Sequence, residues 1–149
     1  MLLFTVILSL ALFAIGCGGK KQTARNVPPA PSLARFDAKA KVLWTEVGYA
    51  CWYGPNFHKK KAANGELYGQ NEMTAAHRTL PLDSIVRVVN LTSHKAAVVR
   101  ITDRGPFARG RIIDLSAAAA KAVDVYIPGT ARVRLDVLET SHPIKHDRR

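Results

Sequence analysis

The chain has 149 residues and a formal net charge of +11 at pH 7, and 48% of its residues are hydrophobic. This length favours one domain with a real core. No cysteine or histidine pair has the spacing of a metal site, and no nucleotide motif is present, so we expect no metal and no cofactor. The basic excess favours an anionic partner, such as a lipid surface, a nucleic acid or an acidic polymer.

The N-terminal residues 1–16 carry no charge and are predicted to form a signal peptide. This run is shorter than the roughly 20 residues that span a bilayer, although it lacks the usual basic start. It ends in Ala-Ile-Gly-Cys, which resembles the bacterial lipoprotein box, with Ala14 where leucine is preferred. We therefore predict lipidation of Cys17 and a linker over residues 17–41. An ordinary signal, or a short anchor with an incidental cysteine, is the alternative.

Export also narrows the choice of partner. By resemblance to lipoprotein sorting rules, Gly18 favours the outer membrane, so we expect a lipoprotein that faces the periplasm of a Gram-negative bacterium. This location disfavours nucleic acid and makes the cell wall, with its lactyl and peptide carboxylates, the natural partner. The expected partners are therefore peptidoglycan glycan strands and the membrane, through a lipid at Cys17.

The first half of residues 42–140, the predicted domain, combines a strand with a long irregular stretch. Residues 46–53 are rich in strand formers, and the Gly-Pro pair after them stops the strand. Residues 56–82 are expected to be irregular, with a tight turn at Asn64 and Gly65.

The second half of the domain alternates apolar and polar residues. Ile85–Leu91 and residues 96–102 are predicted to pair as a hairpin. Ser116 is the expected N-cap of a short helix, and Val133–Glu139 is the last predicted strand. Many short strands with one short helix indicate a small, mainly β barrel. We expect no second domain after Glu139 and a disordered basic tail over residues 141–149.

Two carboxylates lie in contexts that suggest chemistry. Asp103 ends the strand at residues 96–102 and opens an Asp-Arg-Gly-Pro turn, and Glu66 follows the Asn-Gly turn. Burial would raise the pKa of Asp103 and suit a general acid, whereas nearby arginines would hold it ionised. A turn or salt-bridge role for Asp103, and an exposed turn position for Glu66, are the alternatives.

The other acidic residues and one cysteine have ordinary contexts. Asp114 is expected at the approach to the helix N-terminus, where a carboxylate satisfies backbone N–H groups. Asp136 and Glu139 are expected to face outward from the last strand. Cys51 lies in an aromatic context and is predicted to be a small buried hydrophobe.

A histidine and several aromatic residues complete the candidate site. His77 is structural or solvated, or it hydrogen-bonds a catalytic carboxylate or a sugar hydroxyl. The aromatic side chains near residues 52–68 suit the apolar faces of sugars, with core packing as the alternative. The candidate substrate-binding residues are Trp52, Tyr53, Asn64, Arg104 and Arg111.

Together these motifs resemble the rare lipoprotein A (RlpA) family over nearly all of residues 48–138. The matching stretches are GYACWYGPNFHKKKAANGE, TAAHRTLPL, VVRITDRGPFARGRIIDLSAAAAKAV and VRLDVL. The sequence departs from the family pattern at Cys51 and Ala62, where the family usually has hydroxyl residues. The resemblance implies a six-stranded double-psi β-barrel, as in expansins and family-45 endoglucanases.

The resemblance also implies a peptidoglycan lytic transglycosylase that acts on glycan stripped of stem peptides. It assigns Asp103 as the catalytic acid or base, Glu66 as a second essential carboxylate and His77 as a third site residue. Asp103 would protonate the oxygen of the MurNAc–GlcNAc bond, the C6 hydroxyl would capture the sugar as a 1,6-anhydro product, and Glu66 would orient the sugar. A non-catalytic, expansin-like wall-binding protein and a glycoside hydrolase on the same fold are the alternatives.

Overall fold

The computed structural model describes residues 40–142. The predicted signal peptide, Cys17 and residues 143–149 of the predicted tail lie outside the described residues. Among the described residues, no helix is both long and apolar enough to cross a membrane.

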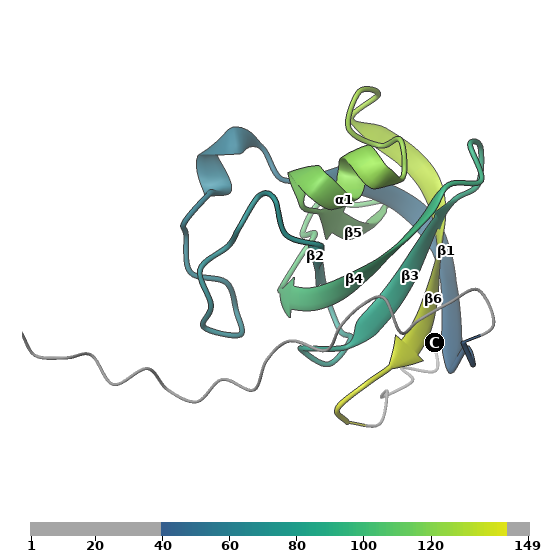
Figure 1. Ribbon diagram of the computed structural model, residues 1–149, viewed down its shortest axis with the longest axis horizontal. Helices are drawn as coiled ribbons and strands as arrows, with labels where there is room; N and C mark the ends of the chain where they lie inside the picture. The colour runs from purple at the N-terminus through teal and green to yellow at the C-terminus, as the bar shows by residue number, and fades with distance from the viewer. Residues whose placement is uncertain (1–39, 143–149) are drawn as a thin grey trace, which may run out of the picture. The chain divides into compact units, whose positions relative to one another are not determined.

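Six strands close into one barrel in the order β1-β5-β2-β4-β3-β6 (Figure 1). Neighbours pair antiparallel except β1 with β5 and β2 with β4, which are parallel. Closure leaves no strand with an unpaired edge within the barrel. The elements are β1 (Trp44–Trp52), the 3-10 helix η2 (Pro55–Phe57), β2 (Thr74–His77), β3 (Ile85–Asn90), β4 (Ala96–Asp103), β5 (Arg111–Leu115), α1 (Ala117–Ala122) and β6 (Thr130–Glu139).

Alternate residues of the strands fill the barrel interior, as the period of a strand requires. On β6, Val133, Leu135 and Val137 are fully buried, and Val99 and Ile101 of β4 meet them in the same core. This burial of branched apolar side chains supplies most of the driving force for folding. The packed core therefore fixes the positions of the strands and of the residues on their outer faces.

The predicted hairpin and helix are confirmed. β3 and β4 pair as a hairpin, closed by a hydrogen bond from the Asn90 N–H to the Lys95 carbonyl. The Ser116 hydroxyl accepts a hydrogen bond from the Ala119 N–H at 3.1 Å and so caps α1. The Asn-Gly turn is also present, with Gly65 at φ 92°, a conformation that suits glycine.

Two short strands were not predicted. β2 lies inside the stretch expected to be irregular, and β5 covers the approach to the helix, where no strand was predicted. β2 has the sequence Thr-Ala-Ala-His, which has little strand propensity, but all four residues are buried between β4 and β5. Tertiary pairing decides its conformation, since strand preference depends strongly on context.

Asp136 alternates with the core residues Leu135 and Val137 and so lies on the outer face of the barrel, as expected, but it is not exposed to solvent. Asp136 is 2% exposed, and its carboxylate pairs with Arg87 at 3.1 Å and with Arg134 at 2.9 Å. Cys51 is half-buried rather than fully buried, and its thiol donates to the Gly129 carbonyl at 3.1 Å.

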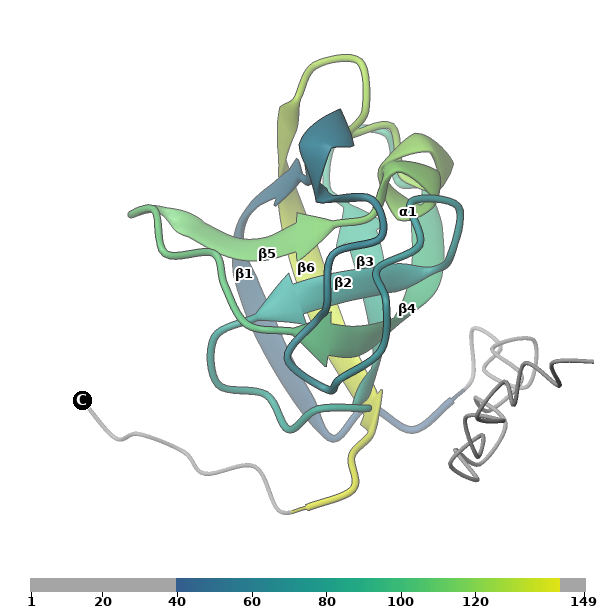
Figure 2. The ribbon, with the colours of Figure 1, turned by 90° about the vertical axis from the view of Figure 1, so that its left-hand side faces the viewer.

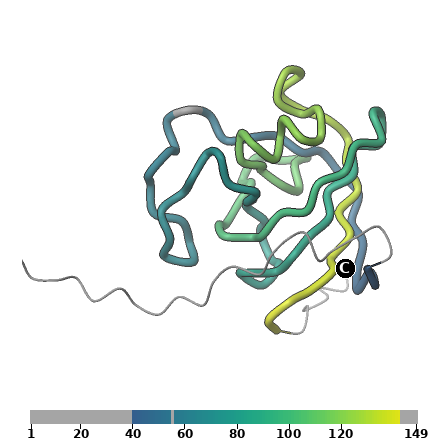
Figure 3. Tube along the Cα trace, in the orientation of Figure 1, coloured from purple at the N-terminus to yellow at the C-terminus, as the bar shows by residue number. Residues whose placement is uncertain are grey.

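The connection between β1 and β2, residues 53–73, leaves the barrel and folds back beside it (Figure 3). Turned by 90°, the molecule shows this connection running across the face made by β5, β2 and β4 (Figure 2). Helix α1 and residues 123–129 lie at one end of the same face. These segments surround the candidate site.

Candidate active site

A bulge in the parallel pair β2–β4 brings two aspartates onto one face of the sheet. Ala75 pairs with Ile101, but a register shift then places Ala76 opposite Asp103 rather than Thr102. Because the bulge adds one residue to β4, the side chain of Asp103 faces outward and not into the core. On its other side Ala76 pairs with Asp114 of β5. Asp103 and Asp114 therefore flank one small residue on the middle strand.

This pairing fixes the approximate separation of the two carboxyl-bearing residues. Neighbouring strands lie about 4.8 Å apart, so the Cα atoms of Asp103 and Asp114 are about 10 Å apart, two strand spacings. Ala76 between them is fully buried and does not itself line a cavity. The two aspartates thus lie on the same outer face of the sheet, on the two strands that flank β2.

The two aspartates line a groove with a volume of about 460 Å³. Tyr53 and Trp52 form one part of its wall, and the loop at residues 104–108 forms another. Phe57 and Phe107 stand at its rim, 45% and 84% exposed. Exposed aromatic rings beside a groove offer flat apolar surfaces to a sugar.

Three hydrogen bonds fix the Asp103 carboxylate. It accepts from the Tyr53 hydroxyl at 3.3 Å, from the Ala63 N–H at 3.0 Å and from the Arg104 N–H at 2.8 Å. Burial, followed by the charges of Asp103 and Asp114, raises the pKa of Tyr53, so the phenol keeps its proton and remains a donor. Asp103 is thus held in one orientation at the mouth of the groove.

Asp114 has a different environment. Its Oδ1 atom is buried and accepts no hydrogen bond from the described residues, although Arg111 Nε lies 3.7 Å away as an ion pair. Burial raises the pKa of Asp114, and the charge of Arg111 opposes that rise only in part. A carboxyl that keeps its proton to higher pH is suited to act as a general acid.

Asp114 was not among the catalytic residues predicted from the sequence, in which it was expected at the approach to a helix. The strand is visible in retrospect, because Ile113 and Leu115 are buried in the core while Asp114 alternates with them to the outer face. The pattern of apolar and polar residues in Arg-Ile-Ile-Asp-Leu was the sequence signal that could have indicated this strand.

Glu66 lies beside the groove and not among the residues that line it. Both of its oxygens pair with the guanidinium of Arg100, at 2.6 and 3.1 Å, and Arg100 also binds Asp83. The hydrogen bonds from Arg100 hold the pKa of Glu66 below its usual range, so the carboxylate stays ionised. Glu66 therefore fastens the 59–68 loop to β4, and this loop carries the Ala63 N–H that binds Asp103.

His77 is buried and organises the turn after β2. Its Nδ1 atom accepts hydrogen bonds from the Thr79 and Leu80 N–H groups, so the ring proton is on Nε2, 3.0 Å from Glu46. The carbonyls of His77 and Leu80 accept from the Arg104 guanidinium at 3.2 and 2.8 Å. His77 thus acts on the groove through Arg104.

Of the predicted substrate-binding residues, four line the groove and one does not. Trp52, Tyr53, Arg104 and Arg111 line the groove, as a binding role requires. Asn64 lies outside the lining residues and instead accepts a hydrogen bond from the Glu66 N–H at 3.1 Å. Within residues 40–142, no group of three or more histidine, cysteine, aspartate or glutamate residues could hold a metal ion.

Comparison with solved structures defines the class of fold. Streptomyces papain inhibitor is 17% identical with a TM-score of 0.54, over 67% of this chain and 99% of that one. A mutant of Clavibacter michiganensis expansin in complex with cellohexaose is 14% identical with a TM-score of 0.53, over 67% of this chain and 54% of that one. The protein is therefore a double-psi β-barrel, as the resemblance implied.

The family follows from the sequence matches. The lytic transglycolase family matches residues 45–135, so the chain belongs to that family. A probable endolytic peptidoglycan transglycosylase RlpA of Synechocystis sp. is 49% identical over 76% of this chain and 36% of its own length. Endolytic peptidoglycan transglycosylase RlpA of Vibrio cholerae is 52% identical over 68% of this chain and 39% of its own length. The resemblance to rare lipoprotein A is thereby confirmed, and the chain spans little more than a third of these relatives.

Proposed function

We propose that this protein is a peptidoglycan lytic transglycosylase that cleaves the MurNAc–GlcNAc bond of peptide-stripped glycan strands. The observation that carries the proposal is the groove of this lytic transglycolase domain, which Asp103 and Asp114 both line from the two strands that flank β2. Such a reaction needs a proton donor, a proton acceptor and a bound sugar ring, and it consumes no water.

The two carboxyl groups allow the acid and base roles to be divided. Asp114, whose pKa is raised by burial, donates its proton to the glycosidic oxygen as the bond to the anomeric carbon breaks. The C6 hydroxyl of the same sugar then attacks the anomeric carbon, and its proton passes to Asp103. The products are one strand with a free hydroxyl and one with a 1,6-anhydro end.

The surrounding residues support the assignment of Asp114 as the acid and Asp103 as the base. Tyr53 and two backbone N–H groups orient Asp103, as a base in a fixed position requires. Phe57 and Phe107 offer ring faces to sugars at the rim of the groove. Glu66 and His77 are positioning residues in this scheme, since they hold the loop that reaches Asp103 and the turn that binds Arg104.

The proposal is tested by incubating the purified protein with glycan strands lacking stem peptides and identifying the products by mass spectrometry. Fragments with 1,6-anhydro ends are expected. Fragments with reducing ends would contradict the lyase and point to a glycoside hydrolase on this fold. Strands that are bound but not cut would leave the expansin-like, wall-binding function.

The assignment of the proton to Asp114 has its own test in the variant Arg111→Gln. The Arg111 charge lowers the pKa of Asp114, so its removal is expected to raise that pKa. An acid must be protonated to work, so the rate falls as pH rises through its pKa. The alkaline limb of the profile of kcat/KM against pH is therefore expected to move to higher pH.

Arg109→Gln provides the matched control, because Arg109 is an exposed arginine two residues before Arg111 and does not line the groove. Its alkaline limb is expected to stay in place. An unmoved limb in Arg111→Gln would assign the catalytic proton to a different group.

We also propose that the protein is a lipoprotein of the outer membrane, anchored at Cys17 and facing the periplasm. The supporting observation is the sequence Ala-Ile-Gly-Cys after an uncharged apolar run, followed by Gly18. Metabolic labelling with a fatty-acid analogue is expected to mark the wild-type protein and not Cys17→Ser, and labelling of both would contradict this anchor.

A further inference from the structure

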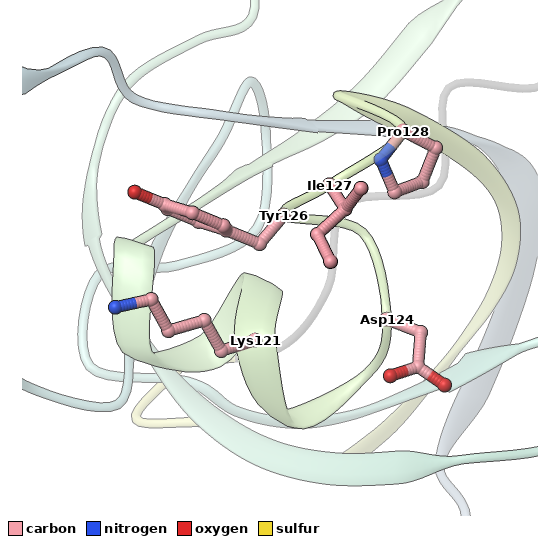
Figure 4. Close-up of a pocket in the computed structure, with 5 residues that line it drawn as sticks. All are labelled: Lys121, Asp124, Tyr126, Ile127 and Pro128. Carbon is pink, nitrogen blue, oxygen red and sulfur yellow. The ribbon is translucent and has the colours of Figure 1, made fainter.

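A second hollow lies beyond the groove, between α1 and the connection to β6. Its volume is about 490 Å³, and its lining residues are Lys121, Asp124, Tyr126, Ile127 and Pro128. Figure 4 shows the Lys121 side chain extending along the Tyr126 ring, with the Asp124 carboxylate on the opposite side of the view. Apart from these two charged side chains, its walls are apolar.

The walls of this hollow are fixed by backbone hydrogen bonds. The N–H groups of Val125 and Tyr126 both donate to the Ala120 carbonyl, at 2.8 and 3.2 Å. Gly129 donates to the Val125 carbonyl at 3.0 Å, and its own carbonyl accepts from the Cys51 thiol. The hollow is therefore preformed, and a ligand would not have to order the loop.

Two stacked rings connect the hollow to the groove. Trp52, which lines the groove, packs against Tyr126, which lines the hollow, with ring centroids 4.4 Å apart and planes inclined by 30°. The two cavities thus share one aromatic partition. The hollow therefore adjoins the groove on the other side of the Trp52–Tyr126 pair.

The charges of the hollow favour an anion. Asp124 is paired with Lys95 at 2.9 Å, which offsets its charge. Lys121 forms no ion pair with any residue of the described part of the chain, and its ammonium lies 4.7 Å from the centroid of the Tyr126 ring. Ile127, which also lines the hollow, is 95% exposed. A cation with no ion-pair partner among the described residues, in a hollow with exposed apolar surface, suits a ligand that carries both a carboxylate and methyl groups.

We propose that this hollow, the Tyr126 hollow, is a distal subsite that binds a carboxylate-bearing, N-acetylated sugar of the same glycan strand. The lactyl carboxylate of the sugar pairs with Lys121, and its methyl groups pack on Ile127 and Pro128, since Trp52 and Lys121 already lie against the Tyr126 ring. The inference rests on the proposed function, since it takes the strand in the groove to be peptide-stripped peptidoglycan, in which that carboxylate is free.

The test measures binding in an Asp103→Asn background, in which the proposed cleavage of the strands is slowed. Two ligands of equal length are compared by isothermal titration at physiological salt: peptide-free peptidoglycan strands, which are acidic, and chitin oligosaccharides, which are neutral. Lys121→Glu is expected to weaken binding of the acidic strands about tenfold, the effect of replacing an attractive charge by a repulsive one. Binding of the neutral oligosaccharide is expected to change less than about twofold.

The variant Ile127→Ser tests the apolar contact between the ligand and the hollow. Ile127 is almost fully exposed, so the substitution leaves the core intact and is expected to weaken both ligands about threefold by removing apolar contact. Lys41→Glu is the matched control, because Lys41 is an exposed lysine that precedes β1, at the opposite end of that strand from Trp52.

Several outcomes would overturn the subsite. An equal loss in Lys121→Glu and Lys41→Glu would show a general charge effect, and unchanged binding in Ile127→Ser would exclude the apolar contact. A failure of the starting variant to bind the acidic strands would overturn it as well. Cleavage by the wild-type protein is read separately from its products, so the subsite can fail while the proposed activity holds.

Discussion

Asp103→Asn is expected to lower the rate of glycan cleavage by about 10²–10⁴-fold, the usual contribution of a general acid or base. The amide has the size of the carboxylate. Its oxygen can still accept from the Ala63 and Arg104 N–H groups, and its NH₂ group can donate to the Tyr53 hydroxyl, but it cannot take up the proton of the attacking hydroxyl. Binding of glycan strands is therefore expected to change less than about twofold. Single-turnover cleavage and titration with uncut strands measure the two quantities.

A matched pair of variants shows whether this loss is specific to the groove. Glu72→Gln removes a carboxylate from an exposed position outside the groove and is expected to keep full activity. Asp114→Asn removes the proton donor and is expected to show a loss of the same order as Asp103→Asn. Wild-type activity in Asp103→Asn would remove this residue from the chemistry, whatever the outcome for Asp114.

The place of Asp103 could be predicted from the sequence, and that of its partner could not. An aspartate at the end of an apolar strand, followed by Gly-Pro, already indicates a strand end beside a turn. Its pairing with Ala76 depends on a bulge between Ala75 and Ala76 in a strand of four residues. No local pattern encodes that bulge, because it arises from pairing between segments far apart in the sequence.

The same limit applies to the roles of Glu66 and His77. Motif comparison selects both residues, but it does not say what they touch. Glu66 binds Arg100 and His77 binds Glu46, partners more than thirty residues away in the chain. Neither residue lines the groove, so in the proposed scheme a loss of activity on their substitution would reflect the position of a loop or turn.

The positions of these residues depend on a closed frame, and β6 forms a large part of it. This strand pairs with both β1 and β3, and Asp136 lies in its middle. The Asp136 carboxylate joins Arg134 of its own strand to Arg87 of β3 and lies 3.4 Å from the hydroxyl of Thr45 on β1. The sequence alternation placed this residue outward, and the paired arginines explain why a charge is tolerated where the side chain is buried.

Asp136→Asn is therefore expected to lower the free energy of unfolding by about 3 kcal/mol, since it removes the buried negative charge that faces Arg87 and Arg134. The value falls at the lower end of the usual range because Arg134 reaches solvent. Asp124→Asn, which breaks an exposed pair with Lys95, is expected to cost less than about 1 kcal/mol. Denaturant unfolding of the purified proteins at neutral pH measures both, and equal losses would contradict the structural role of Asp136.

The difference between wild type and Asp136→Asn is also expected to depend on pH. Burial would raise the pKa of Asp136, but the hydrogen bonds and charges of Arg134 and Arg87 outweigh it and hold that pKa below its usual value. A carboxyl with a lowered pKa in the folded state stabilises the protein above the unfolded-state pKa, and this stabilisation is lost as pH falls through the folded-state pKa. The two unfolding curves should therefore converge in acid. A constant difference down to the most acidic conditions at which the protein stays folded would show that Asp136 acts by packing and not by charge.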